Sequence, residues 1–188
     1  MLREETKWHE FCTRLLQTEA FRQIYTRNLT MRPFIQFAES TALGTFREIL
    51  HPDFDESLRN KCLEESGKLC GELFLKYARL DTDTDIDTFI ANLMNVSVGQ
   101  RQLERKGDVV FDKYFRGNGS RPIHERCRCR IIRSGQVEPT SLMCMCAAYS
   151  EKAIFETVVK HPVQVKLLDS VLCTGSDACR WLIRIESD

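Results

Sequence analysis

The sequence lacks a surplus of either charge, because its 27 basic and 27 acidic side chains cancel. Proteins that bind nucleic-acid phosphates usually carry an excess of lysine and arginine, so we expect no direct nucleic-acid binding. No apolar stretch approaches the roughly 20 residues that cross a bilayer. The polar N-terminal segment, with three acidic residues, resembles neither a signal peptide nor a transit peptide. We therefore expect a cytoplasmic protein without membrane contact.

Common catalytic and nucleotide-binding motifs are also missing. The sequence has no G-x-S-x-G, no P-loop, no dinucleotide fingerprint and no internal repeat. With four histidines, of which only His124 is near the cysteines in sequence, we expect no Cys-His-acid triad. The 188 residues suit a single domain, with a helical portion over 1–95 and an α+β ligand-binding portion over 96–188.

Hydrophobic spacing predicts different secondary structure in the two portions. Apolar residues recur at helical spacing in the first, including a long segment after Asp55 and another that begins near Asp85. Gly67 and Gly71, four residues apart in the long segment, would let another backbone pack closely. The pattern predicts an α+β fold, in which a helical N-terminal half packs on an antiparallel sheet with a covering helix.

The second portion alternates apolar and polar residues, as half-buried strands require. Residues 163–172 and 179–185 predict two antiparallel strands joined by the turn 175–177, with a helix over 141–160 packed on the sheet. The segment CRCRIIR, 127–133, predicts a further strand.

Cysteine is abundant: six of the nine cysteines follow residue 126, and four of these form the C-x-C pairs Cys127/Cys129 and Cys144/Cys146. Four thiolates can complete a tetrahedral site for zinc or iron, and in a strand both members of a pair would share a face. His124 offers a nitrogen ligand. The alternatives are functional thiols without a metal, and small apolar residues buried in a core. A metal site requires the two pairs to lie close together.

The C-terminal run SVLCTGSDACRWLIRI resembles the end of the 4-vinyl reductase family of small-molecule-binding domains, which includes L-2-amino-thiazoline-4-carboxylate hydrolase-like proteins. Gly175, Asp177, Cys179 and Trp181 approximate its strand, turn and strand, with one residue shifted and Trp in place of Phe. The resemblance implies an α+β ligand pocket between a curved antiparallel sheet and helices.

The resemblance also implies a zinc site, but this sequence has only some of its ligands. Aromatic-sensing members use a glutamate and three cysteines, two of which frame the terminal turn. Cys179 matches the last of these, but Val171 and Ser170 stand where a cysteine and the glutamate would be. The site cannot be transferred whole, which leaves Cys127, Cys129, Cys144 and Cys146 as the better candidate ligands.

Three functions remain open. The first is a small-molecule-binding sensory domain, which would need a regulatory partner protein and could form a homodimer. Its expected pocket residues are Phe74, Tyr77, Phe111, Tyr149, Phe155 and Trp181. The second is a hydrolase of a small amide or heterocyclic compound. Its candidate nucleophiles and acid/base groups are Cys144, Cys146, His124, Glu125 and Glu151. The third is a thiol or metal redox sensor.

Overall fold

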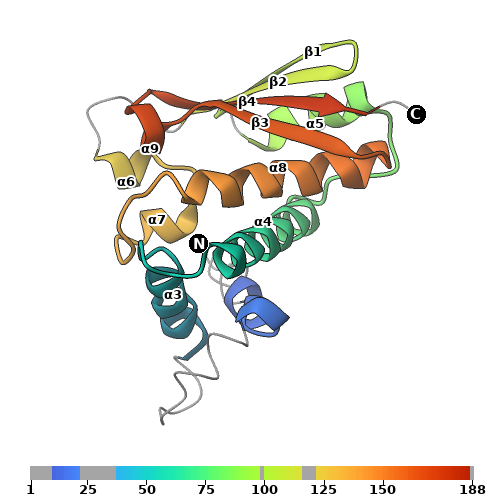
Figure 1. Ribbon diagram of the computed structural model, residues 1–188. Helices are drawn as coiled ribbons and strands as arrows, with labels where there is room; N and C mark the ends of the chain where they lie inside the picture. The colour runs from blue at the N-terminus through green and yellow to red at the C-terminus, as the bar shows by residue number, and fades with distance from the viewer. Residues whose placement is uncertain (1–9, 22–36, 98–99, 116–121, 187–188) are drawn as a thin grey trace.

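A helical first half is followed by a four-stranded sheet and further helices in the computed structural model, which describes residues 10–21, 37–97, 100–115 and 122–186 (Figure 1). After a short helical stretch at 10–15, the elements are α3 (Phe37–Ile49), α4 (Glu56–Ala78), α5 (Ile86–Val96), β1 (Arg101–Lys106), β2 (Val109–Phe115), α6 (Ile123–Arg126), α7 (Arg130–Arg133), α8 (Met143–Val159), β3 (Val163–Asp169), α9 (Val171–Thr174) and β4 (Ala178–Ile185). The predicted α+β architecture is confirmed.

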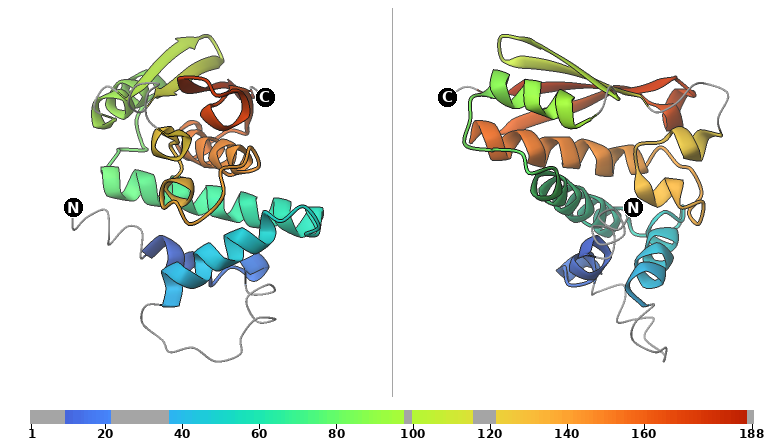
Figure 2. Two further views of the ribbon diagram at one scale, coloured as in Figure 1. Left: turned by 90° about the vertical axis from the view of Figure 1, so that its left-hand side faces the viewer. Right: turned by 180° about the vertical axis from the view of Figure 1, so that it is seen from behind.

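The sheet is antiparallel throughout, with the strand order β1-β2-β4-β3. Trp181 of β4 lies opposite Asp112 of β2 and Leu167 of β3. Helix α8 runs beneath the sheet, and α4 lies on the other side of α8, so α8 is the middle layer (Figures 1 and 2). The predicted pairing of the two last strands under a covering helix is therefore confirmed.

Two glycines bring α4 and α8 into close contact. A Cβ atom at Gly67 would lie 2.5 Å from the Cys146 carbonyl oxygen, and one at Gly71 would lie 2.8 Å from the Ser150 carbonyl oxygen. Real side chains do not approach backbone so closely, so both positions require glycine at this spacing of the helices. The prediction that another backbone packs against these glycines is confirmed.

Side-chain caps begin three of the helices. Asp55 accepts a hydrogen bond from the Leu58 amide at 2.7 Å and begins α4. Asp85 accepts bonds from two amides and begins α5, where the sequence placed a helix start. Ser170 Oγ accepts a bond from the Cys173 amide at 2.9 Å and begins α9. These oxygens satisfy amides that have no partner within the helix.

Two local predictions were wrong. The segment 127–133 is not a strand, because the chain leaves α6 at Cys127 and enters α7 at Arg130. The strand predicted over 163–172 ends at Asp169, because the Ser170 cap starts α9 and Gly175 ends it at a φ of 72°. A positive φ favours glycine, which explains the abrupt end of that helix.

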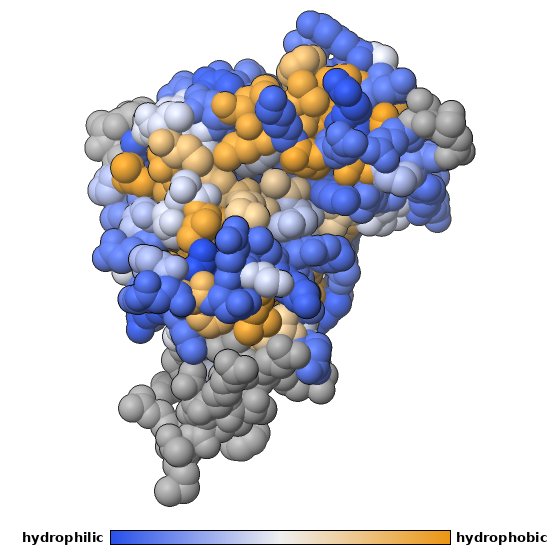
Figure 3. Space-filling view, in the orientation of Figure 1, coloured by the Kyte–Doolittle hydropathy of each residue, from blue (hydrophilic) through white to orange (hydrophobic). Residues whose placement is uncertain are grey.

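The apolar side chains form two cores, one on each side of α8. The first joins the N-terminal helices with α7, and the second lies between α5, α8 and the sheet. On the sheet, Phe111 and Leu168 remain 38% and 48% exposed. Figure 3 shows apolar side chains over the sheet end of the molecule, mixed with hydrophilic ones. Within the described residues, none of the helices combines the length and apolar character needed to cross a membrane.

Candidate functional site

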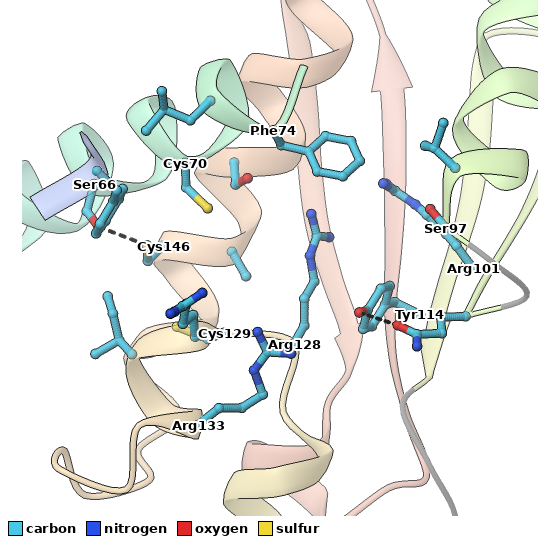
Figure 4. A pocket seen from close by; sticks show the side chains of 18 residues that line it. Ser66, Cys70, Phe74, Ser97, Arg101, Tyr114, Arg128, Cys129, Arg133 and Cys146 are labelled. Carbon is cyan, nitrogen blue, oxygen red and sulfur yellow. Dashed lines mark hydrogen bonds between the residues drawn. The ribbon is translucent and has the colours of Figure 1, made fainter. Parts of the chain in front are cut away.

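A cavity of about 350 Å³ lies between α4, α7, α8 and the start of the β1–β2 hairpin (Figure 4). Its volume is within the range of roughly 300–1,000 Å³ that small-molecule sites occupy. It is lined by Phe11, Ser66, Cys70, Leu73, Phe74, Val96, Ser97, Gln100, Arg101, Tyr114, Arg128, Cys129, Arg130, Ile131, Arg133, Cys146, Ala147 and Ser150.

The lining divides between cationic and apolar side chains. Four of its described residues are arginines, and none is aspartate, glutamate or histidine. Arg128 and Arg133 extend from the α6–α7 region toward the centre of the site, whereas Phe74 projects from α4 (Figure 4). A cavity with this division suits a ligand that has an anionic group and an apolar body.

A buried charge network lies behind the lining and contributes Arg101 and Arg128 to it. Arg101 donates to both carboxylate oxygens of Asp112, at 2.9 and 2.6 Å, and also to Glu151. Arg128 donates to the other oxygen of Glu151. The side chains of Arg101, Asp112 and Glu151 are at most 1% exposed, whereas that of Arg128 is 17% exposed. Two cations and two carboxylates therefore balance, and Arg128 is the member nearest to solvent.

Arg128 also connects the cavity to the sheet. Its guanidinium carbon lies 5.3 Å from the ring centre of Tyr114 and 5.7 Å from that of Trp181. Burial, followed by the neighbouring charge of Arg101, lowers the pKa of Arg128. The ion pair with Glu151 and the two aromatic rings favour the charged form. Arg128 is thus held between the pocket and β4.

One buried hydroxyl in the lining has no partner. Ser150 is 3% exposed, and its Oγ makes no hydrogen bond with the described residues. A buried polar atom left unpaired costs about 1–3 kcal/mol. Two further polar contacts of the lining are satisfied within the protein: Cys146 Sγ donates to Ser66 Oγ at 3.4 Å, and Tyr114 donates to Gln100 at 3.0 Å (Figure 4). A ligand oxygen in the cavity would give Ser150 the missing partner.

The two C-x-C pairs are split between two separate groups of sulfurs. The pocket thiols, Cys70, Cys129 and Cys146, all line the cavity. The α9 thiols are Cys127, Cys144, Cys173 and Cys179: Cys144 interacts electrostatically with the other three, and Cys179 interacts with Cys127 and Cys173. Among the described residues, which include every cysteine, no group of three or more Cys, His, Asp or Glu side chains is placed to hold a metal ion.

Helix geometry explains the split. Cys144 and Cys146 are both in the first turns of α8. Each residue of an α-helix is rotated by about 100° from the one before, so two residues that are two apart point to nearly opposite sides of the helix. Cys127 and Cys129 flank Arg128 between two short helices rather than sharing one face of a strand. The juxtaposition of the two pairs that a four-cysteine clip requires is therefore not formed, and zinc gains no support.

The thiols also lack the surroundings of a nucleophile. Burial raises the pKa of Cys144 to about 12 and holds the pKa of Cys146 well above its usual value. Their hydrogen-bond acceptors are the hydroxyls of Ser170 and Ser66. A reactive cysteine needs a lowered pKa and a nearby base, so the geometry gives no support to the hydrolase reading.

The proposed acid/base groups lie apart from the cavity lining. His124 is half-buried and Glu125 exposed on the short helix α6. Glu151 is fully buried and bound by two arginines, which leaves it no free oxygen for catalysis. None of these three residues lines the cavity.

Of the six aromatic residues predicted to form a pocket, the cavity lining includes Phe74. Tyr77 donates to Glu10 at 2.6 Å, and Phe111 is on an exposed strand position beneath Lys106. Tyr149 is half-buried, and its Cβ faces Gly67. Phe155 and Trp181 are buried in the core next to the sheet. None of these five residues belongs to the described lining.

The sequence reasoning missed the arginines that dominate the cavity. They come from β1, from the α6–α7 connection and from α7, so no single periodic pattern unites them. One local signal was available. Arg126, Arg128, Arg130 and Arg133 fall within eight consecutive residues of a chain that has no overall charge.

Comparison with known proteins identifies the fold but no family. No family model matches the sequence, and no curated protein matches it. Among solved structures, a Tt H-NOX double variant is similar over 98% of this chain and 94% of its own, with a TM-score of 0.51 and 8% identity. An H-NOX protein from S. oneidensis in the Fe(II) ligation state has a TM-score of 0.46 and 9% identity, over 97% and 94% of the two chains.

The resemblance to the 4-vinyl reductase family was wrong, because the structural similarity is to an H-NOX domain instead. The misleading signal was a short terminal motif. Its strand, turn and strand in fact contain the extra helix α9 between Ser170 and Gly175. At 8% identity, the comparison establishes the arrangement of helices and strands and nothing about the ligand.

Proposed function

We propose that the protein is a small-molecule-binding sensory domain whose cavity takes an organic anion with a compact apolar body. The observation that carries this proposal is the lining, in which four arginines and no acidic residue surround the described cavity. Guanidinium groups bind carboxylates and phosphates through paired hydrogen bonds. Leu73, Phe74 and Ile131 would cover the apolar body.

Arg133, Arg128 and Ser150 have distinct roles in this proposal. The charges of Arg101 and Arg128 are already balanced by Asp112 and Glu151. An added anion therefore needs a further cation, and Arg133 in the lining supplies it. The unpaired Ser150 Oγ would donate to a ligand oxygen.

Arg128 is the residue that would transmit ligand binding in the cavity to the rest of the domain. It touches the cavity, pairs with α8 through Glu151 and lies over Trp181 of β4. A ligand shifts a conformational equilibrium only when it binds one state better than the other. An anion that draws Arg128 toward the cavity would favour one position of the α6–α7 segment, which a regulatory partner protein could read.

The name of the structural neighbours, heme-nitric oxide/oxygen binding, raises heme as a rival ligand. The described lining offers no histidine to hold a heme iron. His51 and His161 are exposed, and His124 is half-buried outside the lining. Burial raises the pKa of Cys129 to about 11 and holds that of Cys146 well above its usual value, which disfavours the thiolate that would bind iron. The fourth histidine, His9, lies outside the described residues. The described residues thus do not fit a histidine-held heme, and no step of the proposal uses one.

Thermal shift and titration calorimetry with benzoate, neutral benzamide and hemin test the proposal. Benzoate and benzamide have nearly the same shape, so charge is the main difference between them. We expect benzoate to stabilise the protein and benzamide to have little effect. Arg133→Gln should weaken benzoate about 10–100-fold, since a hydrogen bond to a charged group contributes about 1.5–3 kcal/mol.

Arg105→Gln is the matched control, because Arg105 pairs with Asp87 at 2.9 Å and does not line the cavity. It should leave benzoate binding unchanged. Equal binding of benzoate and benzamide would overturn the anionic assignment. Stoichiometric hemin binding that benzoate does not displace would replace it with a heme-binding function.

A further inference from the structure

The α9 thiols include a pair whose sulfur atoms are in contact. Cys173 Sγ lies 3.9 Å from Cys144 Sγ. Cys144 is at the start of α8 and is 6% exposed, whereas Cys173 is on α9 and is exposed. Ser170 lies between them, since its Oγ accepts from the Cys144 thiol at 3.3 Å and from the Cys173 amide at 2.9 Å.

We infer that Cys144 and Cys173 form a peroxide-sensitive dithiol that closes reversibly to a disulfide. The sulfurs must approach by about 2 Å to reach the bonded distance of about 2.05 Å. That movement is small for a four-residue helix at the edge of the sheet. The assignment stands apart from the cavity and its ligand, because neither cysteine lines the cavity.

Exposure decides which sulfur reacts first. Cys173 is the only exposed cysteine among the nine, all of which are described. Its thiolate attacks a hydroperoxide, so an S–O bond forms, the O–O bond breaks, and the product is a sulfenic acid and an alcohol or water. Cys144 stays a thiol at this stage, because burial raises its pKa to about 12.

Cys144 then acts as the resolving cysteine. Its sulfur attacks the sulfenic sulfur of Cys173, the S–O bond breaks, and the departing hydroxide takes the Cys144 proton to form water. Two thiols are oxidised by two electrons, and one hydroperoxide is reduced. The step removes the hydrogen bond from Cys144 to Ser170 and ties the first turn of α8 to α9. The same turn of α8 carries Cys146, which lines the cavity.

The neighbouring sulfurs are poorer partners. Cys127 and Cys179 are 4% and 5% exposed, whereas Cys144 already has its sulfur 3.9 Å from that of Cys173. Burial raises the pKa of both thiols. We therefore expect one specific disulfide rather than a mixture.

Peptide mapping of the full chain tests the inference. Reduced protein is treated with stoichiometric hydrogen peroxide, alkylated with N-ethylmaleimide under denaturing conditions, and digested with trypsin without reductant. Cleavage at Arg133, Lys152, Lys166 and Arg180 places Cys144 in 134–152 and Cys173 in 167–180. We expect these peptides to be linked with the loss of two hydrogen atoms and to separate after dithiothreitol.

Each peptide holds a second cysteine, so matched variants are needed. The link should vanish in Cys144→Ser and Cys173→Ser, and should persist in Cys146→Ala and Cys179→Ala. Fragmentation of the wild-type linked peptide gives the same assignment without any substitution. Both cysteines recovered as maleimide adducts after the peroxide is consumed would overturn the inference. A link through Cys146 or Cys179 would do the same.

Discussion

The pocket thiols and the α9 thiols differ in what surrounds them. Cys70, Cys129 and Cys146 face a cavity that four arginines share. The α9 thiols have other sulfurs and Ser170 as neighbours, and one of them is exposed. Cysteines that are adjacent in the sequence therefore serve different regions. Close spacing of residues in a chain gives close side chains only when the backbone conformation directs them to one face.

The largest effect in this comparison should come from the charge network behind the pocket thiols. Glu151→Ala leaves Arg101 and Arg128 without the carboxylate that joins them. We expect a loss of about 3–5 kcal/mol in the free energy of unfolding, because removing one partner strands a buried charge. Urea denaturation measures it. Glu64→Ala, which removes an exposed pair with Lys68, should cost less than about 1 kcal/mol.

If Glu151→Ala cost no more than Glu64→Ala, water would have to solvate the two guanidinium groups. The part of the cavity lined by Arg101 and Arg128 would then be open to solvent, and the contrast with the α9 thiols would lose its physical basis.

A smaller effect is expected at the contact of α4 with α8, which holds the cavity wall in place. Gly67→Ala would place a methyl group 2.5 Å from Cys146 O and Tyr149 Cβ. Separating the helices should cost about 1–3 kcal/mol. Gly44→Ala on α3 is the matched control, because nothing lies within 4 Å of its Cβ position. It should stabilise the protein by about 0.5–1 kcal/mol. Thermal unfolding of both variants measures the two effects, and equal stabilities of Gly67→Ala and Gly44→Ala would contradict the expected cost.

The fold was predictable from the sequence wherever a single local pattern determines a helix, a strand or a packing contact. Asp55 and Asp85 marked helix starts, Gly67 and Gly71 marked a close packing site, and the alternation in the last strands gave the sheet. Each of these features depends on the local chain or on a simple period, so the residues themselves carry the information.

The candidate site was harder to predict because it is assembled from distant segments. Glu151 joins Arg101 to Arg128, and the three residues come from α8, β1 and the α6–α7 connection. The alternating pattern of 127–133 and 163–172 predicted continuous strands. The short helices around Arg128 and the helix that the Ser170 cap begins are local features that this alternating pattern does not reveal. Tertiary contacts, rather than propensity, separate the sulfurs into two groups.

The most direct test of the binding site is the alkylation rate of individual cysteines with and without saturating benzoate, followed by mass spectrometry. The account predicts that benzoate slows the modification of Cys70 and Cys129, which are half-buried in the cavity wall. The rate at Cys173, which is exposed beside α9, should not change. Protection of Cys173 alone, or benzoate binding without protection of Cys70 and Cys129, would contradict the assignment of the cavity as the anion site.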